Sequence, residues 1–486
     1  MTEQHDLGDL KPEPVWGHFL ALTRIPRPPK QEEHVRDHVL SWAAERGLEA
    51  TVDEEGNVVV RVAASAGRAR APAVVLQAHL DMVCERDPDS PNDPRAGRIE
   101  VVRDGEWIAA RGTTLGADNG IGVAAAMAAA EDRELAHGPL ELLFTVSEEQ
   151  GLDGAKALDP ALVSGRLLLN LDGTSDTGIT IGCAGSTHTF TRLRLPLEPA
   201  PDGHTALEAT VSGARGGHSG ADIAKGRVNA IKALGRVLSR AYESERFRLA
   251  WLEGGVSRNA IPREAHAIVS VRREAETPFR EAAERELAAL REQYPGSDDG
   301  LVLSIESTAL GDAADEQTTA RALDLLAALP TGVIAMTPQL PGAVETSTSL
   351  NVASSDGGVL TLASMTRSAN PAALDDVVAT IQAAGRLAGA DAEIRRSYPP
   401  WRPELDSRLL TTARGSFSRL YGVEPTLEVV HGGLECAVIG SKLEGVEMIS
   451  IGPEIIGPHA PGERLSIPGT QRFYRLLGAL LDDLSS

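Results

Sequence analysis

The hydrophobic residues of this chain form two different patterns, which predict two kinds of domain. Amphipathic or alanine-rich stretches at 31–48 and 120–135 predict helices. Between them lie short, nearly continuous apolar blocks, at 57–64 (NVVVRVAA), 71–82 (APAVVLQAHLDM), 140–146 (LELLFTV) and 166–172 (RLLLNLD). Continuous apolar strands separated by helices predict an α/β sheet that is covered on both faces.

The pattern changes after about residue 186. Half-polar strands such as 187–198 (THTFTRLRLPLE) surround amphipathic helices such as 278–294. This alternation predicts an α+β domain whose sheet is covered on one face. The arrangement of strands and helices occurs twice, over roughly 187–308 and 309–397, which suggests two similar halves, although no sequence identity supports a duplication.

The tail returns to the first pattern, with helices expected at 407–422 and 470–484. We therefore predict one catalytic domain, made of residues 1–186 and 398–486, that is interrupted by an inserted domain at 187–397. The Pro-rich segment at 398–404 would be the return linker.

Composition narrows the class of protein. The formal net charge of −22 disfavours nucleic acid and acidic membrane surfaces as partners. No apolar run approaches ~20 residues, and the acidic start of the chain does not resemble a secretory signal. Cys84, Cys183 and Cys436 are widely spaced and fit reduced thiols of a cytoplasmic protein.

Acidic and histidine residues gather at the ends of the apolar blocks, where open α/β sheets bind ligands. His79 and Asp81 share one face of a strand end, and the carboxylate could orient the imidazole. A core histidine satisfied by a local acid explains this pair equally well. Asp118 lies between glycines, ahead of the alanine-rich stretch, where it could also be a helix N-cap. Glu148 and Glu149 follow another block and could form a solvated turn.

Two further candidates have simple alternatives of their own. Asp172 ends the block at 166–172, where an Asp-Gly turn is the ordinary interpretation. His459 lies in a loop rich in Pro and Gly, where it could be a surface histidine.

Taken together, these blocks supply two histidines and several carboxylates from separate elements of one domain. Such a set suits a pair of divalent cations about 3.5–4 Å apart, which polarise a carbonyl and acidify a bridging water. A general base is still needed to move the proton from that water to a leaving amine. The pair Glu148 and Glu149 offers one carboxylate more than the ligands require.

The blocks AHLDM, GADNG, SEEQG, NLDG and GPHAP, together with HGGLEC at 431–436, resemble the M20 metallopeptidases over nearly the whole chain. Their spacing is most similar to the bacterial aminoacyl-histidine dipeptidase branch (peptidase D, Xaa-His dipeptidase). The resemblance implies a mixed-sheet α/β/α di-metal catalytic domain with an inserted α+β lid. It also implies two divalent ions, zinc first, with manganese or cobalt as alternatives. One ion would be held by His79 and Asp172, the other by Glu149 and His459, with Asp118 bridging both.

The same resemblance gives roles to two neighbouring carboxylates. Asp81 would orient His79, and Glu148 would be the general base and acid. It also implies a cis peptide bond between Asp118 and Asn119.

In the inserted domain the resemblance implies a lid that contributes to substrate binding. His218 would stabilise the oxyanion, either in its own subunit or from a partner, although Ser219 could instead cap a helix there. Asn259 and Arg367 match substrate-binding positions, and a guanidinium can grip a free α-carboxylate. His431 and Glu435 would line the pocket.

The expected function is a cytoplasmic, homodimeric dipeptidase that hydrolyses Xaa-His and related dipeptides such as β-alanyl-histidine. An N-acyl amino acid deacylase is the alternative within the same fold. A non-catalytic binding protein is the alternative from another class, and the intact set of ligands and base argues against it.

Overall fold

The computed structural model describes residues 7–486 and divides into two compact units. Unit 1 comprises the chain up to Gly182 with Trp401–Val430 and Leu434–Ser486. Unit 2 comprises Cys183–Pro400 and the short segment His431–Gly433. The sequence pattern had placed that short segment in the catalytic domain.

Unit 1 is built on a mixed sheet with the strand order β1-β2-β6-β3-β7-β23-β8-β22. The central strands β3, β6, β7 and β23 run parallel, whereas β2 pairs antiparallel with β6, and β8 with β23. The strands are β1 (Glu49–Val52), β2 (Val58–Val62), β3 (Val74–His79), β6 (Leu140–Thr145), β7 (Leu167–Asn170), β8 (Gly178–Cys183), β22 (Thr426–Val430) and β23 (Glu447–Ser450).

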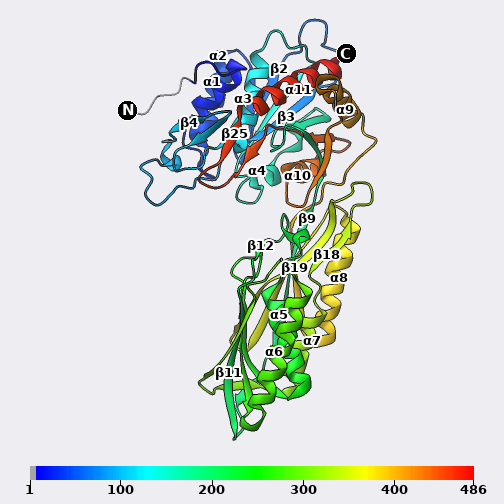
Figure 1. The fold of residues 1–486 in the computed structure, drawn as a ribbon. Helices are drawn as coiled ribbons and strands as arrows, with labels where there is room; N and C mark the ends of the chain where they lie inside the picture. Colours follow the sequence, from blue (N-terminus) through cyan, green and yellow to red (C-terminus); the bar gives the residue numbers. More distant parts are fainter. Residues whose placement is uncertain (1–6) are drawn as a thin grey trace. The chain divides into compact units, whose positions relative to one another are not determined.

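Helices cover this sheet, and every residue of β3, β6 and β7 is buried. Neighbouring residues of a strand point to opposite faces of the sheet, so strands that are buried throughout must be covered on both faces. This confirms the α/β/α prediction for unit 1. The helices are α1 (Glu13–Leu22), α2 (Glu33–Glu45), α3 (Ala117–Glu131), α4 (Asp153–Ala157), α9 (Arg408–Tyr421), α10 (Glu435–Lys442) and α11 (Ile467–Ser485) (Figure 1). A small sheet adds β4 (Val101–Asp104), β5 (Trp107–Ala110), β24 (Ile455–Ile456) and β25 (Arg464–Ser466).

The alanine-rich stretch forms α3, and its composition explains how closely it packs. All of its residues from Asn119 to Ala129 are buried, and α3 lies against α1 and β3. Small side chains let the helix axis approach the sheet, which places the N-terminus of α3 beside the carboxyl ends of the central strands.

Unit 2 is built on an antiparallel sheet with the order β16-β11-β15-β13-β19-β20-β9-β21, to which β18 adds beside β19. Its main strands are β9 (Gly185–Arg194), β11 (His204–Ser212), β13 (Phe247–Gly254), β15 (Ala265–Arg272), β16 (Val302–Thr308), β18 (Gly332–Met336), β19 (Val344–Asp356), β20 (Val359–Ser368) and β21 (Asp391–Tyr398). Short pairs are formed by β10 (Leu197–Pro199) with β17 (Asp312–Ala314), and by β12 (Gly217–His218) with β14 (Ala260–Ile261).

Helices α5 (Ala230–Ser244), α6 (Glu276–Gln293), α7 (Glu316–Ala328) and α8 (Pro371–Ala388) lie along this sheet (Figure 1). Strands such as β9 and β15 alternate between buried and partly exposed residues, as the sequence predicted for a sheet covered on one face. Strand β9 pairs with β20 and β21, so a strand from the predicted first half lies among strands of the second. The duplication itself stays a prediction.

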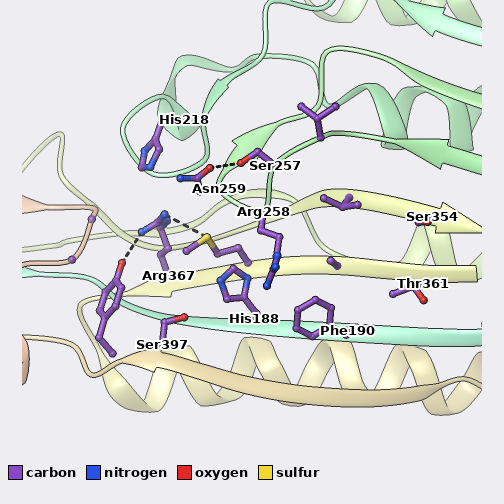
Figure 2. Close-up of a pocket in the computed structure, with 17 residues that line it drawn as sticks. His188, Phe190, His218, Ser257, Arg258, Asn259, Ser354, Thr361, Arg367 and Ser397 are labelled. Atoms are coloured by element: carbon purple, nitrogen blue, oxygen red, sulfur yellow. Dashed lines mark hydrogen bonds between the residues drawn. The ribbon is translucent and has the colours of Figure 1, made fainter. Parts of the chain in front are cut away.

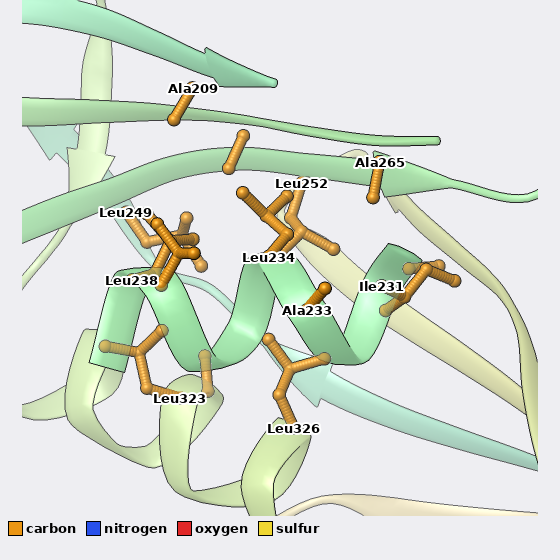
Figure 3. Close-up of a cluster of buried hydrophobic side chains, with 14 of the residues drawn as sticks. Ala209, Ile231, Ala233, Leu234, Leu238, Leu249, Leu252, Ala265, Leu323 and Leu326 are labelled. Atoms are coloured by element: carbon orange, nitrogen blue, oxygen red, sulfur yellow. The ribbon is translucent and has the colours of Figure 1, made fainter. Parts of the chain in front are cut away.

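The core of unit 2 centres on α5 (Figure 3). Leu234 and Leu238 of this helix pack towards Leu249 and Leu252 of β13, and Leu326 of α7 lies on the other side of the helix. The alternative that Ser219 begins a helix is wrong. Helix α5 starts only at Ala230 behind the cap Asn229, and the Ser219 hydroxyl contacts the Met365 sulfur.

Residues 7–486 contain no helix that is both long and apolar enough to cross a membrane.

We expect Leu234→Ala to lower the free energy of unfolding by about 2–5 kcal/mol, because it leaves a cavity at a fully buried position. Urea denaturation of wild type and variant measures this difference. Leu387→Ala is the matched control. Leu387 lies in α8 and is 90% exposed, so its loss should change stability by less than about 0.5 kcal/mol. Equal effects of the two substitutions would contradict the packing described here.

Candidate metal centre

The ends of three parallel strands carry the first group of polar residues. Strand β3 ends at His79, β6 ends shortly before Glu148 and Glu149, and β7 ends shortly before Asp172. Since β6, β3 and β7 are neighbours and run parallel, their carboxyl ends meet at the same edge of the sheet. The site therefore lies where the sequence analysis expected ligands to gather.

Two further residues approach this edge from other elements. Asp118 lies at the start of α3, where its backbone departs from helical geometry, and the peptide bond to Asn119 is cis, as the resemblance implied. His459 lies in the loop between β24 and β25 and has a left-handed backbone with φ of 68°. The N-cap alternative for Asp118 does not describe its side chain, which points to two histidines.

The carboxylate of Asp118 stands between those histidines. One oxygen lies 3.0 Å from Nε2 of His79, and the other lies 3.0 Å from Nε2 of His459. Asp172 Oδ1 is 3.5 Å from Nε2 of His79, and Glu149 Oε2 is 3.2 Å from Nε2 of His459. Two clusters of donor atoms therefore share Asp118, as a bridging carboxylate would require.

The fully buried Asp81 contacts both the His79 ring and the backbone of the two glutamates. Its Oδ1 lies 3.3 Å from Nδ1 of His79 and accepts the backbone N–H of Glu148 at 3.0 Å. Its Oδ2 accepts the backbone N–H of Glu149 at 3.1 Å. One carboxylate thus lies against the His79 ring and holds the turn that carries both glutamates.

Electrostatics within the cluster are strongly perturbed. Hydrogen bonds that the His459 ring donates to the carboxylates of Asp118 and Glu149 raise the pKa of His459 to about 11. Burial alone would lower the pKa of His79, but the carboxylates of Asp172 and Asp118 hold it well above the usual value. Burial raises the pKa of Asp172 to about 7, and contact with the histidines lowers the pKa of Asp118 despite its burial.

Glu148 differs from its neighbour Glu149 in this environment. Burial raises the pKa of Glu148 well above its usual value, and the nearby charges of Asp172 and Glu149 add to the effect. Its ligand atom lies within 4.8 Å of those of His79 and Glu149, yet the contact to His459 is made by Glu149. Glu148 thus lies beside the two clusters, but the carboxylates that contact Nε2 of His79 and of His459 are those of Asp118, Asp172 and Glu149.

The residues fit a pair of divalent cations. Ligand atoms of His79, Asp118 and Asp172 lie within 4.8 Å of one another, and so do those of Asp118, Glu149 and His459. Imidazole nitrogens with carboxylate oxygens are the donors that Zn²⁺ takes in open sites. In addition, Oε1 of Glu149 is buried without a hydrogen-bond partner, and a bound cation would satisfy this oxygen.

Unit 2 holds most of the predicted substrate contacts. His218, Asn259 and Arg367 line one pocket with a volume of about 920 Å³, and Figure 2 shows them together at one end of it. Arg367 is only 3% exposed. It donates to the Tyr398 hydroxyl at 3.0 Å and to the Met365 sulfur at 3.4 Å, its Nε has no hydrogen-bond partner, and no ion pair with a carboxylate is formed within residues 7–486. A buried guanidinium without an anion is the strongest sign of a ligand site in this unit.

Two histidines of unit 2, His218 and His431, lie where the charged form of the ring is disfavoured. Nδ1 of His218 accepts the backbone N–H groups of Gly220 and Ala221, at 3.2 and 3.0 Å, so that its ring proton is left on Nε2. Burial and the charge of Arg367 lower the pKa of His218 and bring the pKa of His431 to about 4. His431 does not line the pocket itself; its Nε2 contacts the Ser347 hydroxyl at 2.7 Å.

Glu435 lies in unit 1, at the start of α10, and is 1% exposed. Its Oε2 accepts hydrogen bonds from Gln77 at 2.6 Å and from Thr145 at 2.7 Å. Burial raises the pKa of Glu435 to about 7. These contacts place it beside β3 and β6, the strands that lead to His79 and Glu149, and it is not among the residues lining the unit 2 pocket.

Sequence reasoning missed three residues that the structure places around the site. Asn119 joins the His79 backbone N–H to the Leu171 carbonyl through its side chain. Arg27 and Glu463 are buried and hold backbone groups beside Asp118. Contacts between residues so distant along the chain leave no local sequence pattern. The position of Glu463 shortly after His459 was the one feature that could have suggested a role at the site.

Comparison with known proteins places this arrangement among the peptidases. Residues 75–483 match the family described as "Peptidase family M20/M25/M40". The cytosol non-specific dipeptidase of Escherichia coli (strain K12) is 36% identical over 483 residues, which cover 99% of each chain. The crystal structure of the aminoacylhistidine dipeptidase from Vibrio alginolyticus aligns with a TM-score of 0.91 at 35% identity, again over 99% of each chain.

A more distant structure shares the fold alone. The aminopeptidase PepT of Bacillus cereus aligns with a TM-score of 0.57 at 17% identity, over 98% of this chain and all of the other. The family match over most of the chain and the full-length similarity to two dipeptidases lead to one conclusion: this chain belongs to peptidase family M20/M25/M40.

Proposed function

We propose that this peptidase is a metal-dependent dipeptidase that hydrolyses Xaa-His and related dipeptides, β-alanyl-histidine among them. The observation that carries the proposal is the Asp118 carboxylate held between His79 and His459, with Glu148 beside it as a further carboxylate. The names of the two full-length relatives, a cytosol non-specific dipeptidase and an aminoacylhistidine dipeptidase, support the substrate class.

In this proposal His79 and Asp172 would hold one cation, Glu149 and His459 would hold the other, and Asp118 would serve both. Two divalent cations, zinc first and manganese or cobalt as alternatives, would polarise the scissile carbonyl and supply an acidified water as the nucleophile. The remaining chemistry belongs to the protein.

Glu148 moves the proton. Its carboxylate takes a proton from the attacking water as the new C–O bond forms, and it returns that proton to the amine nitrogen as the C–N bond breaks. A raised pKa suits both halves of this task, because the group must accept a proton and then give it up near neutral pH. Asp81 keeps Glu148 in place through the backbone N–H and orients His79 at the same time.

Unit 2 supplies substrate contacts. His218 keeps its proton on Nε2, so it can donate to the developing oxyanion without carrying a charge of its own. Arg367, buried without an anionic partner within residues 7–486, can bind the free α-carboxylate of a dipeptide with two hydrogen bonds. Asn259 lines the same pocket, and His431 and Glu435 are the more remote candidates for shaping it.

We further propose that the protein is cytoplasmic and homodimeric, with residues 187–397 as lid and dimerisation domain. A deacylase of N-acyl amino acids would use the same centre, and its substrates also carry an α-carboxylate. The two activities differ in whether a free amine precedes the scissile bond, so the choice of substrate separates them.

We expect Glu148→Gln to keep both cations and to lower kcat by about 10²–10⁴-fold, because it removes the proton carrier alone. Glu149→Gln is the matched control one residue away. It should weaken cation binding, because it removes a charged ligand next to His459. Metal content and turnover of β-alanyl-histidine distinguish the two. Full turnover by Glu148→Gln with both cations bound would refute the proposed mechanism.

We expect Arg367→Lys to lower kcat/KM for dipeptides on the order of 100-fold, because an ammonium cannot replace the paired hydrogen bonds of a guanidinium. The wild-type enzyme should show a similar loss on a dipeptide amide, which lacks the carboxylate. Arg396→Lys is the control, since Arg396 is largely exposed and pairs with Asp375. N-acetyl-histidine turned over faster than Xaa-His dipeptides would favour the deacylase.

We expect Zn²⁺ binding to metal-free protein to release protons and to tighten as the pH rises from about 5.5 to 7.5. The pKa of His459 is about 11 and that of Asp172 about 7, so near neutral pH the ligands hold protons that a cation must displace. Calorimetry in buffers of different ionisation enthalpy measures the release. Heats that are equal in all buffers would show that the ligands are already deprotonated.

A further inference from the structure

Glu463 makes an unusual set of contacts with the segment that leads to Asp118. The side chain is 1% exposed and lies four positions after His459. Its two oxygens accept four successive backbone N–H groups, those of Leu115 (2.7 Å) and Gly116 (3.0 Å) at Oε2 and of Ala117 (2.8 Å) and Asp118 (3.2 Å) at Oε1. Gly116 has a left-handed backbone with φ of 72°, which turns these N–H groups towards one point.

Arg27 holds the same segment from its carbonyl side. It is 1% exposed, and its Nη2 donates to the Gly116 carbonyl at 2.5 Å. Its Nη1 donates to the carbonyls of Leu80 and Asp81, at 3.0 and 2.9 Å. The planar guanidinium therefore ties the end of β3, which carries His79, to the segment that carries Asp118.

The close approach of Arg27 explains why glycine occupies two positions near Asp118. A Cβ added at Gly116 would lie 2.5 Å from Nη2 of Arg27, and one added at Gly120 would lie 2.6 Å from the same atom. At both positions any larger residue would displace the guanidinium. The glycines of this region thus serve a particular contact, besides allowing the left-handed turn.

Burying a cation and an anion that do not pair with each other is costly, and stability alone does not favour it. The charges of Arg27 and Glu463 are nevertheless both satisfied by backbone groups, and both side chains bind the segment that leads to Asp118. Glu463 also comes from the loop of His459, so its carboxylate joins the loops of two residues whose side chains meet at 3.0 Å. Arg27 adds the third, through the strand end of His79.

We propose that Glu463 and Arg27 are positioning residues of the metal centre. They fix the segment Leu115–Asp118 so that the Asp118 carboxylate stays between His79 and His459. This inference rests on the proposed two-cation function, because the position of Asp118 matters for the metal centre only if its carboxylate serves the cations of both His79 and His459. Partners of this kind typically change metal affinity or activity by about 10- to 100-fold when they are lost.

The decisive comparison is Glu463→Gln with Glu141→Gln. Glutamine keeps the size of the side chain but turns an NH₂ group towards two N–H donors, so the segment must move. Glu141 is also buried, and it accepts the N–H groups of Ser164 and Gly165 at 3.0 Å each. It lies near the start of β6, at the opposite end of that strand from Glu148, so its loss tests stability without touching the ligands.

Metal-free proteins are titrated with Zn²⁺ by calorimetry and with Co²⁺ by visible absorption, and thermal unfolding is followed alongside. We expect Glu463→Gln to bind at least one cation about 10- to 100-fold more weakly and to change the Co²⁺ spectrum. Its kcat should fall while KM for β-alanyl-histidine stays within about twofold, because substrate contacts are untouched. Glu141→Gln should lose thermal stability but keep wild-type affinity, spectrum and kcat.

A second variant keeps the test decisive if Glu463→Gln does not fold. Arg27→Lys retains the charge but not the fork, and it should change affinity and spectrum in the same direction. Wild-type affinity and spectrum in every folded variant would overturn the inference, and so would equal losses in Glu141→Gln. Failure of the wild-type protein to bind two cations would instead refute the proposed function.

Discussion

The structure of unit 1 depends on keeping one carboxylate between two imidazoles. Asp118 and His459 are 341 positions apart in the sequence, and Asp118 and His79 are 39 apart, yet both ring nitrogens lie 3.0 Å from Asp118 oxygens. Parallel strands bring His79, Glu149 and Asp172 to one edge. The small residues of α3 then allow this helix, whose first turn contains Asp118, to lie against β3. Much of the architecture of this unit serves to bring together charges that would otherwise be solvated separately.

The histidines of the candidate metal centre and those near Arg367 have pKa values shifted in opposite directions. In unit 1, carboxylates raise the pKa values of His79 and His459, so the cluster holds protons where cations would bind. In unit 2, burial and Arg367 lower the pKa values of His218 and His431, which disfavours the charged form of both rings. The first arrangement suits cations, and the second suits an anionic group of a substrate together with an uncharged hydrogen-bond donor.

The sequence was sufficient for the fold class, for most elements and for gathering the candidate ligands at the strand ends. Continuous apolar blocks predicted β3, β6 and β7, and the residues after them are the ones that converge. Assigning Glu149 to a cation and Glu148 to the proton needed the family resemblance, because adjacent glutamates carry no difference in pattern. Arg27, Asn119 and Glu463 could not be found, since their contacts join backbone groups far away in the sequence. The prediction of a helix capped by Ser219 was wrong, because the preceding residues Gly217 and His218 form strand β12 and pair with β14.

Backbone geometry explains how two adjacent glutamates can face different tasks. Ser147, just before them, has a left-handed φ of 50°, a conformation that is unfavourable for a residue with a side chain. The buried Glu32 carboxylate stabilises it by accepting the Ser147 N–H at 2.8 Å. Beyond this turn, the N–H groups of Glu148 and Glu149 both point to Asp81. Asp81 thus holds the backbone of both glutamates while their carboxylates stay near His79, and of the two it is Glu149 that contacts His459.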